Sequence, residues 1–496
     1  MSSIRHRVAI PCALLLVIAY GDAHADQPAD SAQVLTPDRA VSLALGNSPV
    51  LGASAAQTRQ SRWALTSEGA KFAPTLVLDA GVTRTQTPNA ATSGTAIPRN
   101  DSATAGAEIK KKFSPGTDVS ARLAGTWGQS QMASMPGQSS MLTLGPTYGL
   151  SARIGVTQPL LRGAGREVNR TSILAAESDR KAATRAEEHA ASTLARDTLN
   201  AYAEVWYASR NVGVQKKSLE VATTQRDDAA ARERTGSMAQ ADVLSFETTV
   251  ATKQESVLDA GQALSSKKLE LIRVMGGGVE SDFSTVEELA VPPPEQGDLV
   301  AEAMAHSGEL QQLDASLEAA KLRARVAGES YRSRLDLDAY MQVQGLGNKE
   351  AYPALTQMVG GKAWSAHLGV TYELPISGKR EAEEARATAS VEAAQKNLIA
   401  AQARIRAEVE SLILQERVAR SRAELAARTV EIAEQSAASQ RARMQTGSAT
   451  ALQVIEAENQ VRAAELRALR ATADAFEAVM NLRRATGRLI QYTANR

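Results

Sequence analysis

The sequence predicts a mixed α/β membrane protein whose chain contains two copies of one structural unit. Three observations predict this fold class. Aromatic residues make up only 4% of the 496 residues and long stretches lack proline, which is typical of long helices packed side by side. Segments of alternating apolar and polar residues predict strands with one apolar face. The two halves of the chain also match each other in sequence.

The first 25 residues have the pattern of a secretory signal peptide. Arg5 and Arg7 precede an apolar run from Val8 to Tyr20, which is too short to cross a bilayer as a helix. Small residues follow at Ala23-His24-Ala25, as cleavage requires. The only cysteine, Cys12, lies inside this segment. We therefore expect an exported chain that starts near residue 26 and has neither a disulfide nor a thiolate metal site.

Segment 39–79 matches segment 298–338 without a gap. Val41, Ser48 and Asp79 correspond to Val300, Ser307 and Asp338. The match predicts a first repeat over 26–275, a Gly/Pro linker over 276–297 and a second repeat over 298–490.

Each repeat is predicted to run in the order helix, strands, very long helix and return helix. In the first repeat we expect helices within 37–74, strands within 75–160, a long helix over about 166–234 and a return helix over 238–275. In the second we expect a helix over 298–333, strands over 334–374, a long helix over 379–445 and a return helix over 449–488. Each long helix would extend roughly 100 Å. Apolar residues spaced three and four apart predict coiled-coil packing.

The predicted strands alternate apolar and polar residues over a length that spans a membrane in a β-barrel. A half-buried strand of a soluble sandwich has the same alternation. The signal peptide, and the lack of another apolar body to cover these strands, favour the membrane. Open strand edges are not tolerated in lipid, so closure must come from further copies of the chain. The predicted lipid-facing residues are Leu150, Ile154, Val156, Leu335, Leu337, Leu368, Val370 and Tyr372.

Composition excludes several function classes. The chain has 56 Lys and Arg against 55 Asp and Glu, so it lacks the basic excess of a nucleic-acid binder. Its five histidines are scattered without metal-ligand or catalytic spacing, and no nucleophile–base group is recognisable. The sequence therefore predicts neither an enzyme nor a bound metal or cofactor.

The arrangement resembles the outer membrane efflux protein (TolC-like) family over essentially the whole exported chain. The residues that carry the resemblance are the opening segment 35–49, the strand-to-helix passage Thr157-Gln158-Pro159-Leu160-Leu161-Arg162-Gly163 and the paired turns Arg234-Thr235-Gly236-Ser237 and Gln445-Thr446-Gly447-Ser448. The resemblance implies a homotrimer with a twelve-stranded β-barrel in the outer membrane of a Gram-negative-type cell. It also implies a periplasmic α-helical barrel, and partnership with a periplasmic adapter and an inner-membrane transporter.

The resemblance also implies site residues. Arg234, Thr235, Gly236 and Ser237, with Gln445, Thr446, Gly447 and Ser448, correspond to hairpin tips where adapters dock. An ordinary helix-breaking turn also explains these residues, and both readings are compatible. Asp242, Glu431 and Glu434 are candidates for the periplasmic gate, although a solvated helix face is the simpler explanation of all three acidic residues.

One segment departs from the family pattern. The first repeat holds two additional alternating runs, Ala105–Phe113 and Val119–Trp127, joined by Ser114-Pro115-Gly116-Thr117. They are consistent either with a long external hairpin or with additional barrel strands.

The function that the sequence favours is a passive outer-membrane exit duct for substrates delivered by an inner-membrane pump and a periplasmic adapter. Two alternatives stay open. A coiled-coil surface fibre explains the long helices but not the duplicated amphipathic strands. A periplasmic adapter has one helical hairpin, whereas this chain has two.

Overall fold

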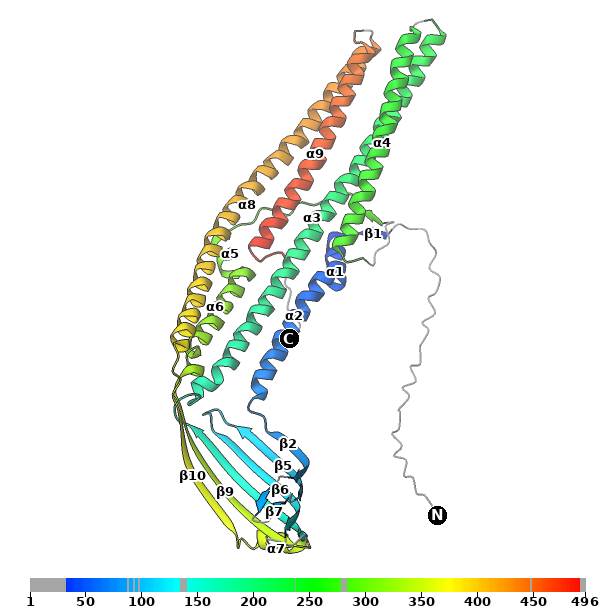
Figure 1. Cartoon of the computed structure of the whole chain (residues 1–496). Helices are drawn as coiled ribbons and strands as arrows, with labels where there is room; N and C mark the ends of the chain where they lie inside the picture. The colour runs from blue at the N-terminus through cyan, green and yellow to red at the C-terminus, as the bar shows by residue number, and fades with distance from the viewer. Residues whose placement is uncertain are drawn as a thin grey trace, which may run out of the picture.

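The computed structural model describes residues 33–86, 89–91, 94–96, 99–133, 141–236, 238–277, 283–446 and 448–490. The predicted signal peptide lies outside the described residues. Figure 1 shows an elongated molecule with two long helical hairpins directed to one end and a curved β-sheet at the other. Each repeat therefore contributes one hairpin and part of the sheet.

Two consecutive helices open each repeat. In the first repeat α1 (Pro37–Asn47) and α2 (Pro49–Ala70) are separated by Ser48, whose backbone is extended. Proline disfavours the helical conformation of the residue before it, so Pro49 ends α1 at this point. The helices expected within 37–74 are thus α1 and α2.

The second repeat has the same break without a proline. Helix α5 (Leu299–His306) ends before Ser307, and α6 (Gly308–Val326) begins after it. The Ser307 hydroxyl accepts a hydrogen bond from Leu310 N at 3.4 Å and so caps α6. A short 3-10 turn, η1 (Glu329–Tyr331), follows. The expectation of one helix over 298–333 is therefore wrong.

The two hairpins contain the longest elements of the chain. Helix α3 (Arg166–Arg234) has 69 residues and returns as α4 (Gln240–Val274), and α8 (Lys379–Gln445) has 67 residues and returns as α9 (Ala451–Ala485). Helix α3 also packs against α9, α6 and α2, so it joins the two repeats. Its length corresponds to roughly 100 Å.

The sheet has six strands in the order β10-β9-β7-β6-β5-β2, all antiparallel. Its strands are β2 (Thr75–Gln86), β5 (Arg99–Lys112), β6 (Asp118–Ala133), β7 (Met141–Pro159), β9 (Arg334–Asn348) and β10 (Trp364–Glu373). The short strands β3 (Asn89–Ala91) and β4 (Gly94–Ala96) form a separate two-stranded ladder. A trimer of twelve barrel strands requires four strands per copy, whereas the main sheet of this chain has six. The two additional alternating runs belong to β5 and β6, which pair within the main sheet.

A short helix interrupts the strands of the second repeat. Helix α7 (Tyr352–Val359) connects β9 to β10 and packs on β9. A Cβ atom on Gly345 would lie 1.9 Å from the carbonyl oxygen of Ala354, and one on Gly347 would lie 2.1 Å from that of Glu350. The contact therefore requires glycine at both positions. The segment 334–374 was expected to hold strands alone.

The predicted linker contributes to the core rather than serving only as a connection. Strand β8 (Phe283–Thr285) lies within it and pairs in parallel with β1 (Gln33–Leu35). The buried Tyr202 of α3 donates a hydrogen bond to Leu35 O at 2.7 Å and accepts one from Val286 N at 3.1 Å. Tyr202 thus holds both strands against the middle of the helical region.

Candidate functional site

All eight predicted lipid-facing residues lie on one face of the sheet. Directly opposed residues of antiparallel strands share a face, and the register pairs Ile154 with Met341, Val156 with Ala339 and Leu337 with Val370. The same face continues through β6, β5 and β2 by the pairs Ala121–Ile154, Ile109–Ala121 and Leu76–Ile109. Leu368 and Val370 are 73% and 65% exposed. The chain thus presents a continuous apolar surface across six strands.

Charged residues bound this apolar surface. On β5, Asp101 and Lys111 share the face of Ala103, Ala105, Ala107 and Ile109, which lie between them. At about 3.4 Å per residue and a strand tilt of about 40°, the stretch from Asp101 to Lys111 rises about 26 Å. This height matches the apolar band of outer-membrane barrels, about 25 Å. Arg84 Nε donates to Asp101 Oδ1 at 2.7 Å and reinforces the far boundary.

Aromatic residues lie near both ends of the same surface. Trp127 and Tyr148 form a directly opposed pair, and Trp127 also opposes Ala103 of β5, next to Asp101 on that face. Tyr372 of β10 lies at the other end, beside the helices. Aromatic girdles of this kind occur at the two interfaces of membrane barrels.

The opposite face of the sheet is polar and carries both signs of charge. Arg122 donates to Asp79 Oδ2 at 2.8 Å and lies 3.5 Å from Glu108 Oε2. The Arg153 guanidinium lies 3.5 Å from the centre of the Tyr340 ring, which in turn stacks on His367. These side chains provide a wall that water and polar solutes can wet.

The turn between α3 and α4 forms the first hairpin tip. Gly236 has φ +77°, a conformation that favours glycine, and its N–H donates to Glu233 O at 2.8 Å. The Thr235 hydroxyl donates to Arg232 O at 2.9 Å. A Cβ atom on Gly236 would meet no atom within 4 Å. Hydrogen bonds therefore fix the turn at Thr235 and Gly236, and the space beside Gly236 can receive a partner. Ser237 lies outside the described residues.

The second tip, between α8 and α9, is built differently. Arg443 O accepts hydrogen bonds from Ser448 N at 2.8 Å and from the Thr446 hydroxyl at 2.9 Å. A capping box joins Thr450 and Gln453 and begins α9. The first tip has no such cap, since Ala239 occupies the corresponding position of α4. Gly447 lies outside the described residues, and the two tips are not interchangeable surfaces.

The candidate gate residues lie on helices near the tips. Asp242 is in the first turn of α4, and its side chain is outside the described residues. Its counterpart in the second repeat, Gln453, is engaged in the capping box. Glu431 and Glu434 are exposed on α8. Glu431 and Glu434 lie on α8, whereas Asp242 belongs to α4 of the other hairpin.

Sequence reasoning missed an ionic cluster in the middle of the helical region. Arg470 of α9 pairs with Glu204 of α3 and, at 2.8 Å, with Asp474. Lys267 of α4 lies 3.3 Å from the same Glu204. The cluster joins three helices through residues far apart in sequence, so no local pattern could reveal it.

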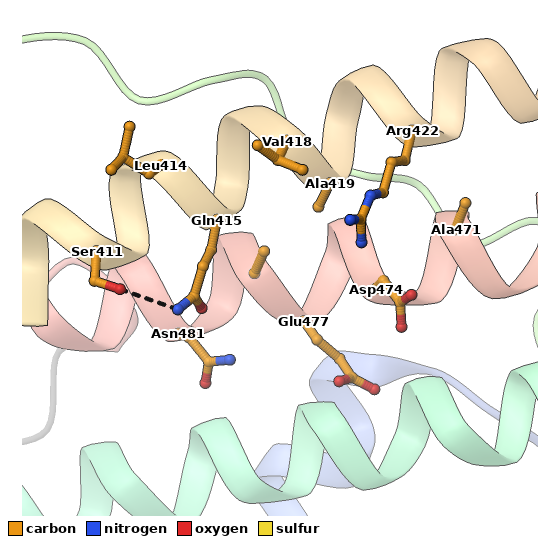
Figure 2. A pocket seen from close by; sticks show the side chains of 11 residues that line it. Ser411, Leu414, Gln415, Val418, Ala419, Arg422, Ala471, Asp474, Glu477 and Asn481 are labelled. Carbon is orange, nitrogen blue, oxygen red and sulfur yellow. Dashed lines mark hydrogen bonds between the residues drawn. The ribbon is translucent and has the colours of Figure 1, made fainter.

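Glu477 belongs to this region and has an unusual environment. It borders a groove of about 490 Å³ between α8 and α9, and Figure 2 shows its carboxyl group pointing from α9 toward α3. Its Oε1 atom is buried without a hydrogen-bond partner. Burial, followed by repulsion from Glu204, raises the pKa of Glu477 to about 7. This carboxyl group therefore titrates near neutral pH.

Two features are absent from the described residues. No group of three or more His, Cys, Asp or Glu within them is placed to hold a metal ion. No helix in this part of the chain is both long and apolar enough to cross a membrane.

The fold and the two-faced sheet define a class: a chain that presents an apolar band at one end and long helical hairpins at the other. Residues 299–488 match the family model described as outer membrane efflux protein. The second repeat is thus similar to the outer membrane efflux protein family, and the resemblance found in the sequence is confirmed.

Solved structures share the fold along most of the chain. The crystal structure of CusC has 12% identity and a TM-score of 0.67, with 91% of each chain covered. VceC from Vibrio cholerae has 17% identity and a TM-score of 0.64, covering 91% of this chain and 96% of its own. The open state of the MtrE outer membrane channel of Neisseria gonorrhoeae has 14% identity and a TM-score of 0.65, covering 91% and 89%. No curated protein sequence matches the chain.

Proposed function

We propose that the chain is one protomer of a passive outer-membrane exit duct. Three copies close their sheets into a barrel in the outer membrane, and their helical hairpins form a tube that crosses the periplasm. The duct receives solutes from an inner-membrane transporter through a periplasmic adapter. The observation that carries the proposal is the six-stranded sheet with an exposed apolar face, on a chain whose residues 299–488 match the outer membrane efflux protein family model.

The dimensions of the apolar face support the outer-membrane location. The band is about 26 Å tall, it is bounded by charged residues and it carries aromatic residues at both ends. A soluble sandwich would cover this face with a second layer. Apart from α7 at its far end, no described helix packs on the sheet face, and Leu78, Leu123 and Ile154 are 72%, 53% and 63% exposed.

The free edges of the sheet support assembly of several copies. Strands β2 and β10 are the first and last in the sheet, so each has one side without a strand partner. Unpaired backbone N–H and C=O groups cost several kcal/mol each in lipid. Closure by identical copies satisfies both edges together. The number of copies, three, is what the resemblance to the outer membrane efflux protein family implies.

The helical hairpins support transport across the periplasm. Helix α3 alone extends roughly 100 Å away from the sheet. Many side chains of α8 are exposed in the single chain, among them Leu414, Leu425 and Ile432. These residues would be covered when hairpins of neighbouring copies pack into a tube.

The proposed mechanism is permeation without chemistry. The polar face of the sheet lines the outer end of the duct, where Arg122, Glu108 and Arg153 keep the wall hydrated. Energy and substrate choice come from the transporter, and the hairpin tips couple the duct to the adapter. Asp242, Glu431 and Glu434 are proposed to lie near the periplasmic gate of the trimer.

Fractionation of the native host tests the proposal. The chain should sediment with outer membranes and elute in detergent with the mass of three copies, and its deletion should increase accumulation of exported dyes. A soluble chain, or an inner-membrane one, would contradict the proposal. A soluble fibre would indicate a surface structure, and a monomer bound to the inner membrane would indicate an adapter.

A further inference from the structure

We propose that the barrel closed by three copies contains eighteen strands, six from each copy, with β2 of one copy pairing with β10 of the next. The inference rests on the proposed trimeric duct and adds the strand number, the copy-to-copy contact and the width. Its starting point is that β5 and β6 lie between β2 and β7 in the sheet.

Strands β5 and β6 are full members of the sheet. They have 14 and 16 residues, compared with 12 in β2 and 15 in β9. The ladder between β2 and β5 runs from Thr75–Lys110 to Gln86–Arg99 without a break. The ladder between β6 and β7 covers the whole of β6, with one irregularity near Gly128.

The turn between β5 and β6 lies at the helical end of the molecule. Gly165, at the start of α3, donates its N–H to Pro115 O at 3.0 Å. A Cβ atom on Gly116 would lie 2.3 Å from Gly163 O, so the turn is in close contact with the strand-to-helix junction. A hairpin outside the cell would place its turn at the opposite end. The hairpin of β5 and β6 therefore spans the whole height of the sheet.

Both added strands have the two faces that a barrel wall requires. Ile109 and Leu123 are each 53% exposed on the apolar face. Glu108 and Arg122 lie on the polar face, and Arg122 also pairs with Asp79 of β2. A hairpin surrounded by water has no need of an apolar face continuous with its neighbours.

Six strands per copy allow the copies to join without a change of direction. Strand β2 begins at the helical end, directly after α2, and β10 ends there, before α8. The two strands are thus antiparallel when neighbouring copies meet, as every other pair in the sheet is. The residues of β2 and β10 are almost all exposed in the single chain, which leaves both edges accessible to a second copy.

The strand number determines the width of the barrel. With strands about 4.8 Å apart and tilted by about 40°, eighteen strands give a backbone diameter of about 36 Å, whereas twelve give about 24 Å. Twelve helices spaced about 8–10 Å apart enclose a tube about 31–39 Å across. The wider barrel therefore continues the helical tube at nearly constant width. Its outer end passes solutes of the size that large porins admit, so size selection takes place at the helical end.

Cysteine pairs can distinguish the two arrangements, because the exported chain has no cysteine of its own. In six strands Leu78 opposes Ala107 and Leu123 opposes Ala152. Leu78 and Ala152 are then three strand spacings apart, about 14 Å, which is too far for a disulfide. If β5 and β6 left the barrel, β2 would adjoin β7 and bring these two residues close.

The experiment oxidises three double variants, Leu78→Cys/Ala107→Cys, Leu123→Cys/Ala152→Cys and Leu78→Cys/Ala152→Cys, as trimers in native outer membranes. We expect disulfides within the chain in the first two and none in the third. Linkage in the third, with none in the first two, would overturn the strand number while leaving the trimeric duct intact. Absence of trimers in all three variants and in the unmodified chain would overturn the duct and the barrel together.

A second pair of variants tests, without oxidation, whether β6 belongs to the barrel wall. Leu123→Arg places a charge on the apolar face of β6 near the middle of the band, whereas Ala124→Arg places it on the polar face. We expect the first to lower the yield of membrane-inserted trimers by about tenfold or more and the second to leave it within about twofold. Equal yields from both variants would overturn the placement of β6 in the barrel wall.

Discussion

The cost of a charge on the sheet should depend on its face and on its depth, and strand β7 offers both comparisons. Leu150 and Val156 lie on the apolar face, and Ser151 lies on the polar face beside Leu150. The three arginine variants Leu150→Arg, Val156→Arg and Ser151→Arg therefore introduce the same charge in three environments.

The register gives the depth of each position. Leu150 opposes Gly125, which opposes Ala105, close to the midpoint between Asp101 and Lys111. Val156 opposes Val119, which opposes Lys111 at the charged boundary. Along a strand tilted by about 40°, Leu150 and Val156 differ in height by about 16 Å.

These depths translate into free energies of insertion. Arginine at the bilayer midplane of a barrel costs about 2–4 kcal/mol, and near the interface about 0–1 kcal/mol. We expect Leu150→Arg to cost about 2–4 kcal/mol per copy, Val156→Arg about 1 kcal/mol or less, and Ser151→Arg close to zero. If the three copies contribute independently, the trimer with Leu150→Arg loses about 6–12 kcal/mol.

Urea titration of folding into lipid vesicles measures these differences, and the yield of trimers in outer membranes provides a second readout. The expected order of stability is unmodified chain, Ser151→Arg, Val156→Arg and then Leu150→Arg. Equal losses for Leu150→Arg and Ser151→Arg would refute the assignment of the two faces. Equal losses for Leu150→Arg and Val156→Arg would refute the depth of the band.

Three further predictions concern the helical region. Gly236→Asn, and Gly447→Asn at the second tip, should reduce dye export while trimers form normally, because a Cβ atom on Gly236 meets nothing in the chain and asparagine tolerates the positive φ of Gly236. Gly213→Asn on exposed α3 is the control, and unchanged export would argue against docking at the tips. Tyr202→Phe should lower the free energy of unfolding by about 2 kcal/mol, because Leu35 O and Val286 N lose a buried hydrogen-bond partner. Tyr207→Phe is the control and should have little effect. Equal urea midpoints for the two variants would contradict the role of the Tyr202 hydroxyl in holding β1 and the segment after β8. The folded-state pKa of Glu477, about 7, exceeds the reference value of 4.5. Between these pH values the folded chain keeps the carboxyl proton that the unfolded chain has lost, so the free energy of unfolding falls as pH rises from 4.5 to about 7. Glu477→Gln should therefore raise the melting temperature more at about pH 8 than at about pH 5, unlike the exposed control Glu247→Gln, and a pH-independent difference would count against the burial of this carboxyl group.

The parts of the fold that the sequence reveals are those encoded in local patterns. Helices α3 and α8 coincide with stretches free of proline, and the strands of the apolar face follow period-two alternation. The break at Ser48 is also encoded locally, by the following Pro49.

Other features depend on contacts between distant segments. Strand β8 is only three residues long and forms because it pairs with β1 and packs near Tyr202. The position of β5 and β6 inside the sheet follows from pairing with β2 and β7, which alternation alone does not specify. The cluster of Glu204, Lys267 and Arg470 likewise requires three helices to be placed first.

The site residues divide in the same way. The apolar positions of the sheet could be predicted because the side-chain period of a strand fixes the face. The gate assignment of Asp242, Glu431 and Glu434 stays a prediction, because the proposed gate needs three copies of the chain and the structure contains one. The two hairpin tips were recognisable from their shared Thr-Gly-Ser sequence, yet the capping box at Thr450 makes them differ in structure.

Electron microscopy of the chain extracted from outer membranes in detergent tests the central claim most directly. The account predicts particles with three-fold symmetry and a tube well over about 100 Å long, the length that a helix of this size adds to the barrel. Compact monomers, or thin rods without a barrel at one end, would contradict the duct.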